Sequence, residues 1–229
     1  MFPIRDDNPA QRTPVVTRTL IAINVVAFLF ELSLGPNRNW FLNNWGLVPA
    51  RLMYGFLGAL PLQEPVTTVF ASMFLHAGWL HLIGNLWYLW IFGDNVEDRI
   101  GRVRFVLFYL AGGVASAALH VFLHPWSEIP VVGASGAIAA VLGAYAVLFP
   151  RARVVTLVPI FFFFQIVALP ALLVLGLWFV FQFLSGTLAL SGAGGGVAWW
   201  AHIGGFVFGM VTVAFLKRRE RRSEAWVEE

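Results

Sequence analysis

Six apolar segments of the chain are each roughly long enough to cross a lipid bilayer, and this feature limits the possible folds more than any other. A membrane-spanning helix needs about 20 predominantly apolar residues, and lipid requires every backbone polar group to be paired internally. Hydrophobic residues make up 59% of the sequence and charged residues 12%, a balance that a water-soluble domain could not bury. The predicted spans are 19–34, 79–96, 103–123, 131–149, 166–190 and 197–216.

These spans predict an all-α membrane protein, a bundle of six transmembrane helices in one domain at 19–216. An N-terminal segment, 1–18, precedes the domain, and a basic tail, 217–229, follows it. The long connection 35–78 alternates aromatic with polar residues and contains several prolines, so we expect a structured loop between the first two helices at the bilayer interface.

The apolar run from Val154 to Leu190 is too long for a single span, and prolines at 159 and 170 interrupt it. We therefore expect an interfacial stretch on the inner side, with Phe161 to Phe164 facing the bilayer, and a fifth helix from about Ile166. The glycine-rich segment Gly192 to Gly196 is expected to be a flexible outer loop and a candidate lid hinge.

Basic residues indicate the orientation, because the loops on the cytoplasmic side of a membrane protein retain Lys and Arg. With a cytoplasmic N-terminus, every basic residue except Arg38 and Arg51 falls on the inner side. We therefore expect both termini to be cytoplasmic. The compact chain and its short tails favour a bacterial cytoplasmic membrane, with an organellar inner membrane as the alternative. The net charge of +3 then reflects orientation, and no nucleic-acid partner is expected. The first 18 residues lack a signal-peptide cleavage pattern and are expected to stay attached.

The sequence has no cysteine, which excludes disulfides, a cysteine nucleophile and cysteine-based metal sites. A serine is the alternative nucleophile. Ser135 begins the fourth predicted span between Gly133 and Gly136, where the backbone can approach a substrate and free N–H groups of a helix start can bind negative charge. On this segment alone, a packing face of small residues, with Gly136, Ala140 and Gly143 at helical spacing, is the favoured explanation.

A serine hydroxyl needs a base to remove its proton, and histidine is the usual one. His202 begins the sixth span on the same outer side as Ser135, and Gly205 and Gly209 follow on nearly the same helix face. That face can press against another helix and bring the imidazole close to it. Taken alone, His202 is better explained as an interfacial histidine beside Trp199 and Trp200 than as a base.

A third group begins the second span, where His81 and Asn85 lie four residues apart on one helix face. Both side chains can donate hydrogen bonds to an oxyanion, although polar packing is an alternative. All three groups lie at outer ends of spans in a topology that was derived from the arginines alone. Packing does not readily explain that coincidence.

The segments GASG around Ser135, AHIGGFVFG around His202 and HLIGN from His81 resemble the three signatures of the rhomboid intramembrane serine proteases. The resemblance implies that Ser135 is the nucleophile and His202 the general base. It implies an oxyanion hole made of the Ser135 N–H and the side chains of His81 and Asn85. It also implies a dyad without a third acid, no cofactor, and substrates that are transmembrane segments of other membrane proteins.

The chain departs from the family pattern at two places. Many members carry Trp-Arg in the first long loop, where this chain has Thr67 and Thr68, and some carry an aromatic residue four positions after the serine, where this chain has Ala139. The second departure leaves the orientation of His202 open.

Other functions have weaker support. His76, His120 and His124 are expected to be structural, and we expect no metal site, although His76 with His81 could imitate a two-histidine one. A transporter would need paired charges at mid-membrane, and only Glu31 approaches that. The main alternative is a rhomboid-fold protein that binds transmembrane helices without cutting them.

Overall fold

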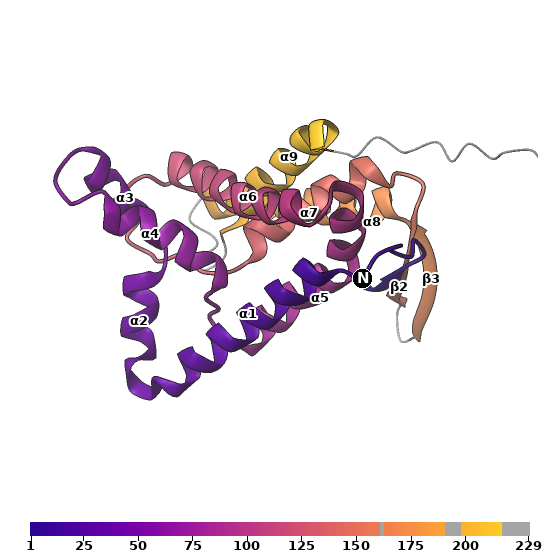
Figure 1. The fold of residues 1–229 in the computed structure, drawn as a ribbon, viewed down its shortest axis with the longest axis horizontal. Coiled ribbons are helices and arrows are strands. Elements are labelled where there is room, and N and C mark those ends of the chain that lie inside the picture. The colour runs from indigo at the N-terminus through magenta and orange to yellow at the C-terminus, as the bar shows by residue number, and fades with distance from the viewer. Residues whose placement is uncertain (161–162, 191–197, 217–229) are drawn as a thin grey trace, which may run out of the picture.

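The computed structural model describes residues 1–160, 163–190 and 198–216. The fold is mainly helical with one small sheet (Figure 1). The helices are α1 (Val15–Ser33), α2 (Arg38–Trp45), α3 (Pro49–Phe56), α4 (Gln63–Ala71), α5 (Trp79–Ile100), α6 (Arg102–Leu123), α7 (Ser135–Leu148), α8 (Ala171–Leu190) and α9 (Trp199–Leu216), and the strands are β1 (Phe2–Asp6), β2 (Arg153–Ile160) and β3 (Phe163–Pro170).

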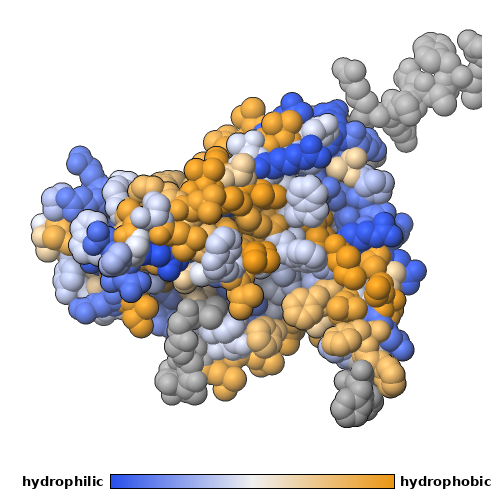
Figure 2. Space-filling view, turned by 90° about the horizontal axis from the view of Figure 1, so that it is seen from below, coloured by the Kyte–Doolittle hydropathy of each residue, from blue (hydrophilic) through white to orange (hydrophobic). Residues whose placement is uncertain are grey.

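The long apolar helices confirm an all-α membrane bundle. Within the described ranges, α1, α6, α8 and α9 are long and apolar enough to span a membrane, and α5 forms a pair with the helical segment before it, bent by 78°. Figure 2 shows apolar residues gathered across the middle of one face, with more hydrophilic residues toward both ends. The count of six spans stays a prediction, because α7 has only 14 residues.

Helix α7 is shorter than the long helices that surround it. At about 1.5 Å per residue it is about 21 Å long, less than the ~30 Å hydrocarbon core of a bilayer. The predicted span started at 131, but Val131 instead forms a β-bridge with Leu47, and the helix begins at Ser135. Ser135 therefore begins a helix that is too short to cross the hydrocarbon core by itself.

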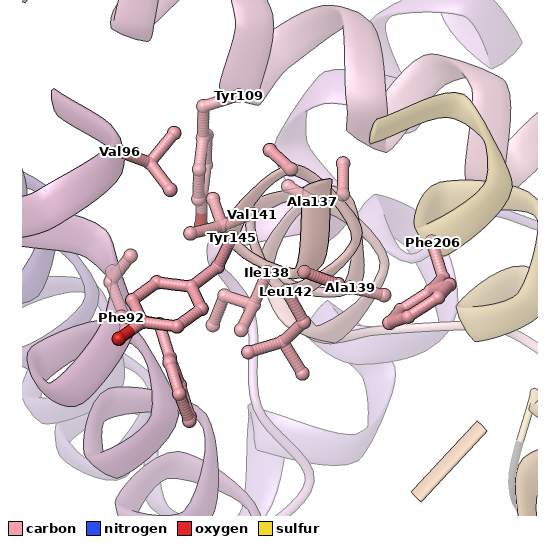
Figure 3. Close-up of a cluster of buried hydrophobic side chains, with 14 of the residues drawn as sticks. Phe92, Val96, Tyr109, Ala137, Ile138, Ala139, Val141, Leu142, Tyr145 and Phe206 are labelled. Atoms are coloured by element: carbon pink, nitrogen blue, oxygen red, sulfur yellow. The ribbon is translucent and has the colours of Figure 1, made fainter. Parts of the chain in front are cut away.

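The interior is built around α7, whose residues from Gly136 to Ala146 are all buried. In Figure 3, Phe92 and Tyr109 lie on one side of this helix and Phe206 on the opposite side. A side chain at Gly205 would collide with the carbonyl of Gly136. The glycines of α9 thus let the two helix backbones touch.

Three short helices and two 3-10 turns make up the long connection between α1 and α5, and Figure 1 shows α2, α3 and α4 at the end of the molecule opposite the sheet. We call these the loop end and the strand end. The buried Glu31 carboxylate joins the connection to α1. It accepts a hydrogen bond from the His76 N–H at 3.0 Å and lies 3.4 Å from the Arg38 guanidinium, which donates to the His76 carbonyl at 2.7 Å.

The strand end differs from the prediction, since a fifth helix from about Ile166 is wrong. Ile166 lies in β3, which pairs antiparallel with β2 in a hairpin, and α8 begins at Ala171. The β-branched residues of both segments favour strands, and Pro170 ends the hairpin where the helix starts. Phe163 and Phe164 are exposed, while the rest of the expected bilayer-facing stretch, the Gly192 to Gly196 hinge and the basic tail lie outside the described residues.

Strand β1 adds to the hairpin beside β2 and ties the N-terminal segment to the helices. The Trp87 indole N–H donates to the Pro3 carbonyl at 2.6 Å. The Tyr145 hydroxyl and the Asn95 amide both donate to the Asp6 carboxylate, at 2.5 and 3.0 Å. The first 6 residues are therefore an integral part of the packed structure.

Candidate active site

A cavity of about 790 Å³ opens among the helices toward the loop end. Ser135, His202, His81 and Asn85 all line it, so the structure brings together the four side chains that the sequence singled out. Other polar groups on its wall come from the end of α6 and the loop after it: His120, His124 and Ser127. A partly polar wall gives water a route to the serine.

Ser135 is the first residue of α7, and the backbone before it has an unusual conformation. Gly133 has φ +131°, which residues with a side chain rarely adopt. A Cβ atom at this glycine would also lie 2.7 Å from His81 Nε2. Glycine therefore allows both the turn into α7 and the close approach of the imidazole. The N–H groups of the first turn have no acceptor within the helix, and that of Ser135 is among them.

His202 reaches Ser135 from the first turn of α9. Its Nε2 atom lies 2.7 Å from Ser135 Oγ, within hydrogen-bond distance. The contact depends on the fit of α9 against α7, where Gly205 and Gly209 meet the carbonyls of Gly136 and Ala140. At each of the four glycines named from the sequence, an added Cβ atom would lie too close to a neighbouring residue: Gly133, Gly136, Gly205 and Gly209.

The sequence interpretation missed Gln182. Its side chain projects from α8, is 5% exposed, and places Oε1 2.7 Å from His202 Nδ1. One turn earlier on the same helix, Trp178 lies against the imidazole at 6.0 Å between ring centroids, while Trp199 approaches edge-on at 6.3 Å. A signal was present in the sequence, because an amide within an apolar span is costly and needs a reason.

His81 has a hydrogen bond that fixes its donor nitrogen. The Ala77 N–H lies 3.4 Å from His81 Nδ1, and accepting this bond leaves the proton on Nε2, which faces Gly133 next to Ser135. The imidazole can therefore donate into the cavity.

Asn85, one turn further along α5, is 7% exposed. Its Nδ2 atom is buried without a hydrogen-bond partner among the residues that the structure describes. Buried amides are almost always paired, so an unpaired donor beside a candidate nucleophile is available to a ligand.

His76 and the two threonines at the first departure from the family pattern, Thr67 and Thr68, contact residues that are close to them in the sequence. His76 is buried with its ring edge-on to His81 at 5.2 Å between centroids. Thr67 and Thr68 donate to carbonyls of α4 itself. Across residues 1–160, 163–190 and 198–216, no three His, Asp or Glu side chains gather as a metal site would require.

The arrangement suits acyl transfer. A hydroxyl has a histidine nitrogen within hydrogen-bond distance, the histidine has a second partner on its other nitrogen, and His81 and Asn85 line the same cavity as the hydroxyl. These are the parts needed to activate an oxygen nucleophile and to bind the oxyanion that its attack creates.

The sequence of this chain is similar to those of known proteins. A family model described as the Rhomboid domain matches residues 63–219. Presenilin-associated rhomboid-like protein A, mitochondrial, of Danio rerio is 34% identical over 168 residues, and Rhomboid protein 1, mitochondrial, of Saccharomyces cerevisiae is 27% identical over 172 residues. Each match covers 69% of this chain but 40% and 45% of those relatives. Rhomboid protease GluP of Bacillus subtilis is 32% identical over 132 residues, 57% of this chain and 24% of that protein.

Proposed function

The chain belongs to the rhomboid family, and we propose that it is a serine endopeptidase that cleaves transmembrane segments of other membrane proteins. The observation that carries this proposal is the 2.7 Å separation between His202 Nε2 and Ser135 Oγ. Relatives that include a named protease support it. A serine next to a base in a cavity without converging donors would be weaker support, because the oxyanion would then be unbound.

In the proposed reaction, His202 Nε2 takes the proton of Ser135 as Oγ attacks the carbonyl carbon of the substrate peptide. The carbonyl oxygen becomes an oxyanion and accepts hydrogen bonds from the Ser135 N–H, His81 Nε2 and Asn85 Nδ2. The imidazolium then gives its proton to the leaving amine as the peptide C–N bond breaks, which leaves an acyl ester on Ser135. A water molecule, deprotonated by His202, attacks this ester and releases the second product.

The depth of Ser135 supports a substrate within the bilayer. Helix α7 starts below the loop end, so a peptide bond must be brought to the serine as an extended stretch rather than as a helix. We propose a multi-pass protein whose arginine-rich strand end faces the inner compartment. Two of the relatives named above are mitochondrial and one is bacterial, so the bacterial cytoplasmic membrane expected from the sequence is one of two candidates.

The test uses the detergent-purified protein, a serine-directed fluorophosphonate probe and a transmembrane model substrate. Wild type should be labelled and should cleave, whereas Ser135→Ala and His202→Ala should do neither. Ser33→Ala, which removes an exposed serine at the end of α1, is the matched control and should behave as wild type.

A rhomboid-fold protein that only captures transmembrane helices is the alternative. It would predict a folded wild-type sample that is neither labelled nor active, and that binds transmembrane peptides with an affinity unchanged by Ser135→Ala. That result would reject the protease.

A further inference from the structure

We propose that Gln182 is a positioning residue that fixes the tautomer and the direction of the His202 imidazole, an inference that rests on the proposed function. Gln182 lies on α8, and its side-chain hydrogen bond goes to His202 and not to the serine or to the donors beside it. It would act on the reaction only through His202.

The two ring nitrogens of His202 have different partners. His202 Nε2 is 2.7 Å from Ser135 Oγ, and His202 Nδ1 is 2.7 Å from Gln182 Oε1. A neutral imidazole carries one proton, and to accept the serine proton Nε2 must be the bare nitrogen. The proton is then on Nδ1 and needs an acceptor. An amide oxygen has no hydrogen to donate, so Gln182 Oε1 at this position selects the tautomer in which His202 can serve as a base.

Burial makes this contact specific. Gln182 is 5% exposed, so its side chain is held by packing although it lies on the cavity wall. Trp178, four residues earlier on α8, tilts by 35° from the imidazole plane, and Trp199 meets the ring edge at 89°. The two indoles limit rotation of the ring about its bonds. Trp178 and Gln182 lie on one face of α8 and together hold the His202 imidazole. Ala139 on α7 has no aromatic ring that could contribute to this support.

The choice of a neutral acceptor fits the surroundings. A carboxylate would stabilise the imidazolium more strongly, but it would place a charge in an apolar span, where charges are expensive. An amide orients the ring and helps to stabilise the imidazolium without adding a buried charge. The sequence contains no Asp or Glu in α8 that could take this role.

The test compares two substitutions of similar size with opposite chemistry. Gln182→Met removes the acceptor, and we expect kcat/KM for a transmembrane substrate to fall about 10-fold to 100-fold, the effect of one lost buried hydrogen bond, with KM little changed. Gln182→Glu supplies a carboxylate acceptor that favours the imidazolium. It should retain more activity than Gln182→Met and move the acid limb of the pH profile upward by roughly one unit. Thr187→Val, an exposed polar-to-apolar change on the same helix, is the control and should match wild type.

A purely structural role for Gln182 would predict equal losses in both variants with no shift of the acid limb, and that result would overturn the proposal. So would wild-type kcat/KM in a folded Gln182→Met protein.

The tautomer gives a readout that does not depend on activity. Nitrogen NMR of histidine-labelled protein should show His202 protonated on Nδ1 in wild type and in Ser135→Ala, and a mixture of tautomers in Gln182→Met. An inactive wild type with the Nδ1–H form would reject the protease but keep the positioning role. An active wild type with the Nε2–H form would reject the role of Gln182 alone.

Discussion

Among single residues, Asn85 combines burial with an unused donor. Its Nδ2 atom has no partner within the described part of the chain and lines the cavity that holds Ser135. If it binds the oxyanion, Asn85→Ala should lower kcat by about 100-fold to 1000-fold and leave KM nearly unchanged, because the bond strengthens only as charge develops. Steady-state cleavage of a transmembrane substrate measures both constants.

Asn44→Ala is the matched control, since Asn44 lies partly exposed in α2, away from the cavity, and donates to the Trp40 carbonyl. A kcat for Asn85→Ala within a few-fold of wild type would assign Asn85 to packing. A rise in KM without a fall in kcat would instead assign it to substrate binding.

The sequence identified Ser135, His202, His81 and Asn85 because each lies at the start of a span, where topology alone sets its depth. Gln182 was missed for a physical reason. It lies in the middle of α8, and its contact with His202 depends on how α8 is rotated and packed against α9. No local pattern encodes that rotation. An amide is costly in lipid, which makes Gln182 unusual within its span, but this cost does not identify its hydrogen-bond partner.

At the scale of helices, the contact between α7 and α9 sets the distance between serine and base. A side chain at Gly209 would collide with the Ala140 carbonyl. Gly209→Ala should therefore separate the helices, lower the free energy of unfolding by about 2 to 3 kcal/mol, and slow fluorophosphonate labelling of Ser135. Unfolding in mixed micelles and labelling rates measure the two effects.

Gly176→Ala is the control on α8, because a Cβ atom there meets nothing within 4 Å. It should leave both quantities near wild type. Normal stability and labelling in Gly209→Ala would mean that α9 can shift without moving His202.

The helix boundaries show where sequence patterns stop being sufficient. The starts of α5, α6 and α9 fall within two residues of the predicted spans, since glycine or charged residues precede the apolar runs. The fifth span was predicted to start five residues too early, because a short apolar run fits a strand as well as a helix. Only the pairing of β2 with both β1 and β3 resolves that ambiguity, and the pairing of β1 with β2 joins segments about 150 residues apart.

For the molecule as a whole, the cavity with the candidate site opens toward the loop end, and Figure 1 shows the sheet at the strand end. The sheet connects three parts of the bundle. β1 is bonded to α5 through Trp87 and to α7 through Tyr145, and β3 continues directly into α8. The attachment of β1 should therefore contribute to the stability of the whole bundle and not only to the order of the N-terminal segment.

Asp6 makes this attachment dependent on pH. Burial raises the pKa of its carboxyl from 3.8 to about 6, against the opposing effect of the hydrogen bond from Tyr145 and with a further rise from the nearby Asp94 charge. The folded protein thus holds this proton more tightly than the unfolded chain. Stability should fall as the pH rises from about 4 through about 6 and should remain at the lower level above that.

Asp6→Asn keeps an oxygen that accepts from Tyr145 but cannot ionise, so its contribution should not vary over this range. The melting temperature of wild type should therefore fall relative to that of Asp6→Asn between about pH 4 and about pH 6, where the unfolded chain is already ionised and the half-buried carboxyl of the folded protein is not. Parallel melting curves for the two proteins would show that Asp6 does not control this attachment. A wild type that gains stability over Asp6→Asn as the pH rises would mean that the ionised carboxylate is the favoured partner of Tyr145 and Asn95, with their hydrogen bonds outweighing the cost of burial.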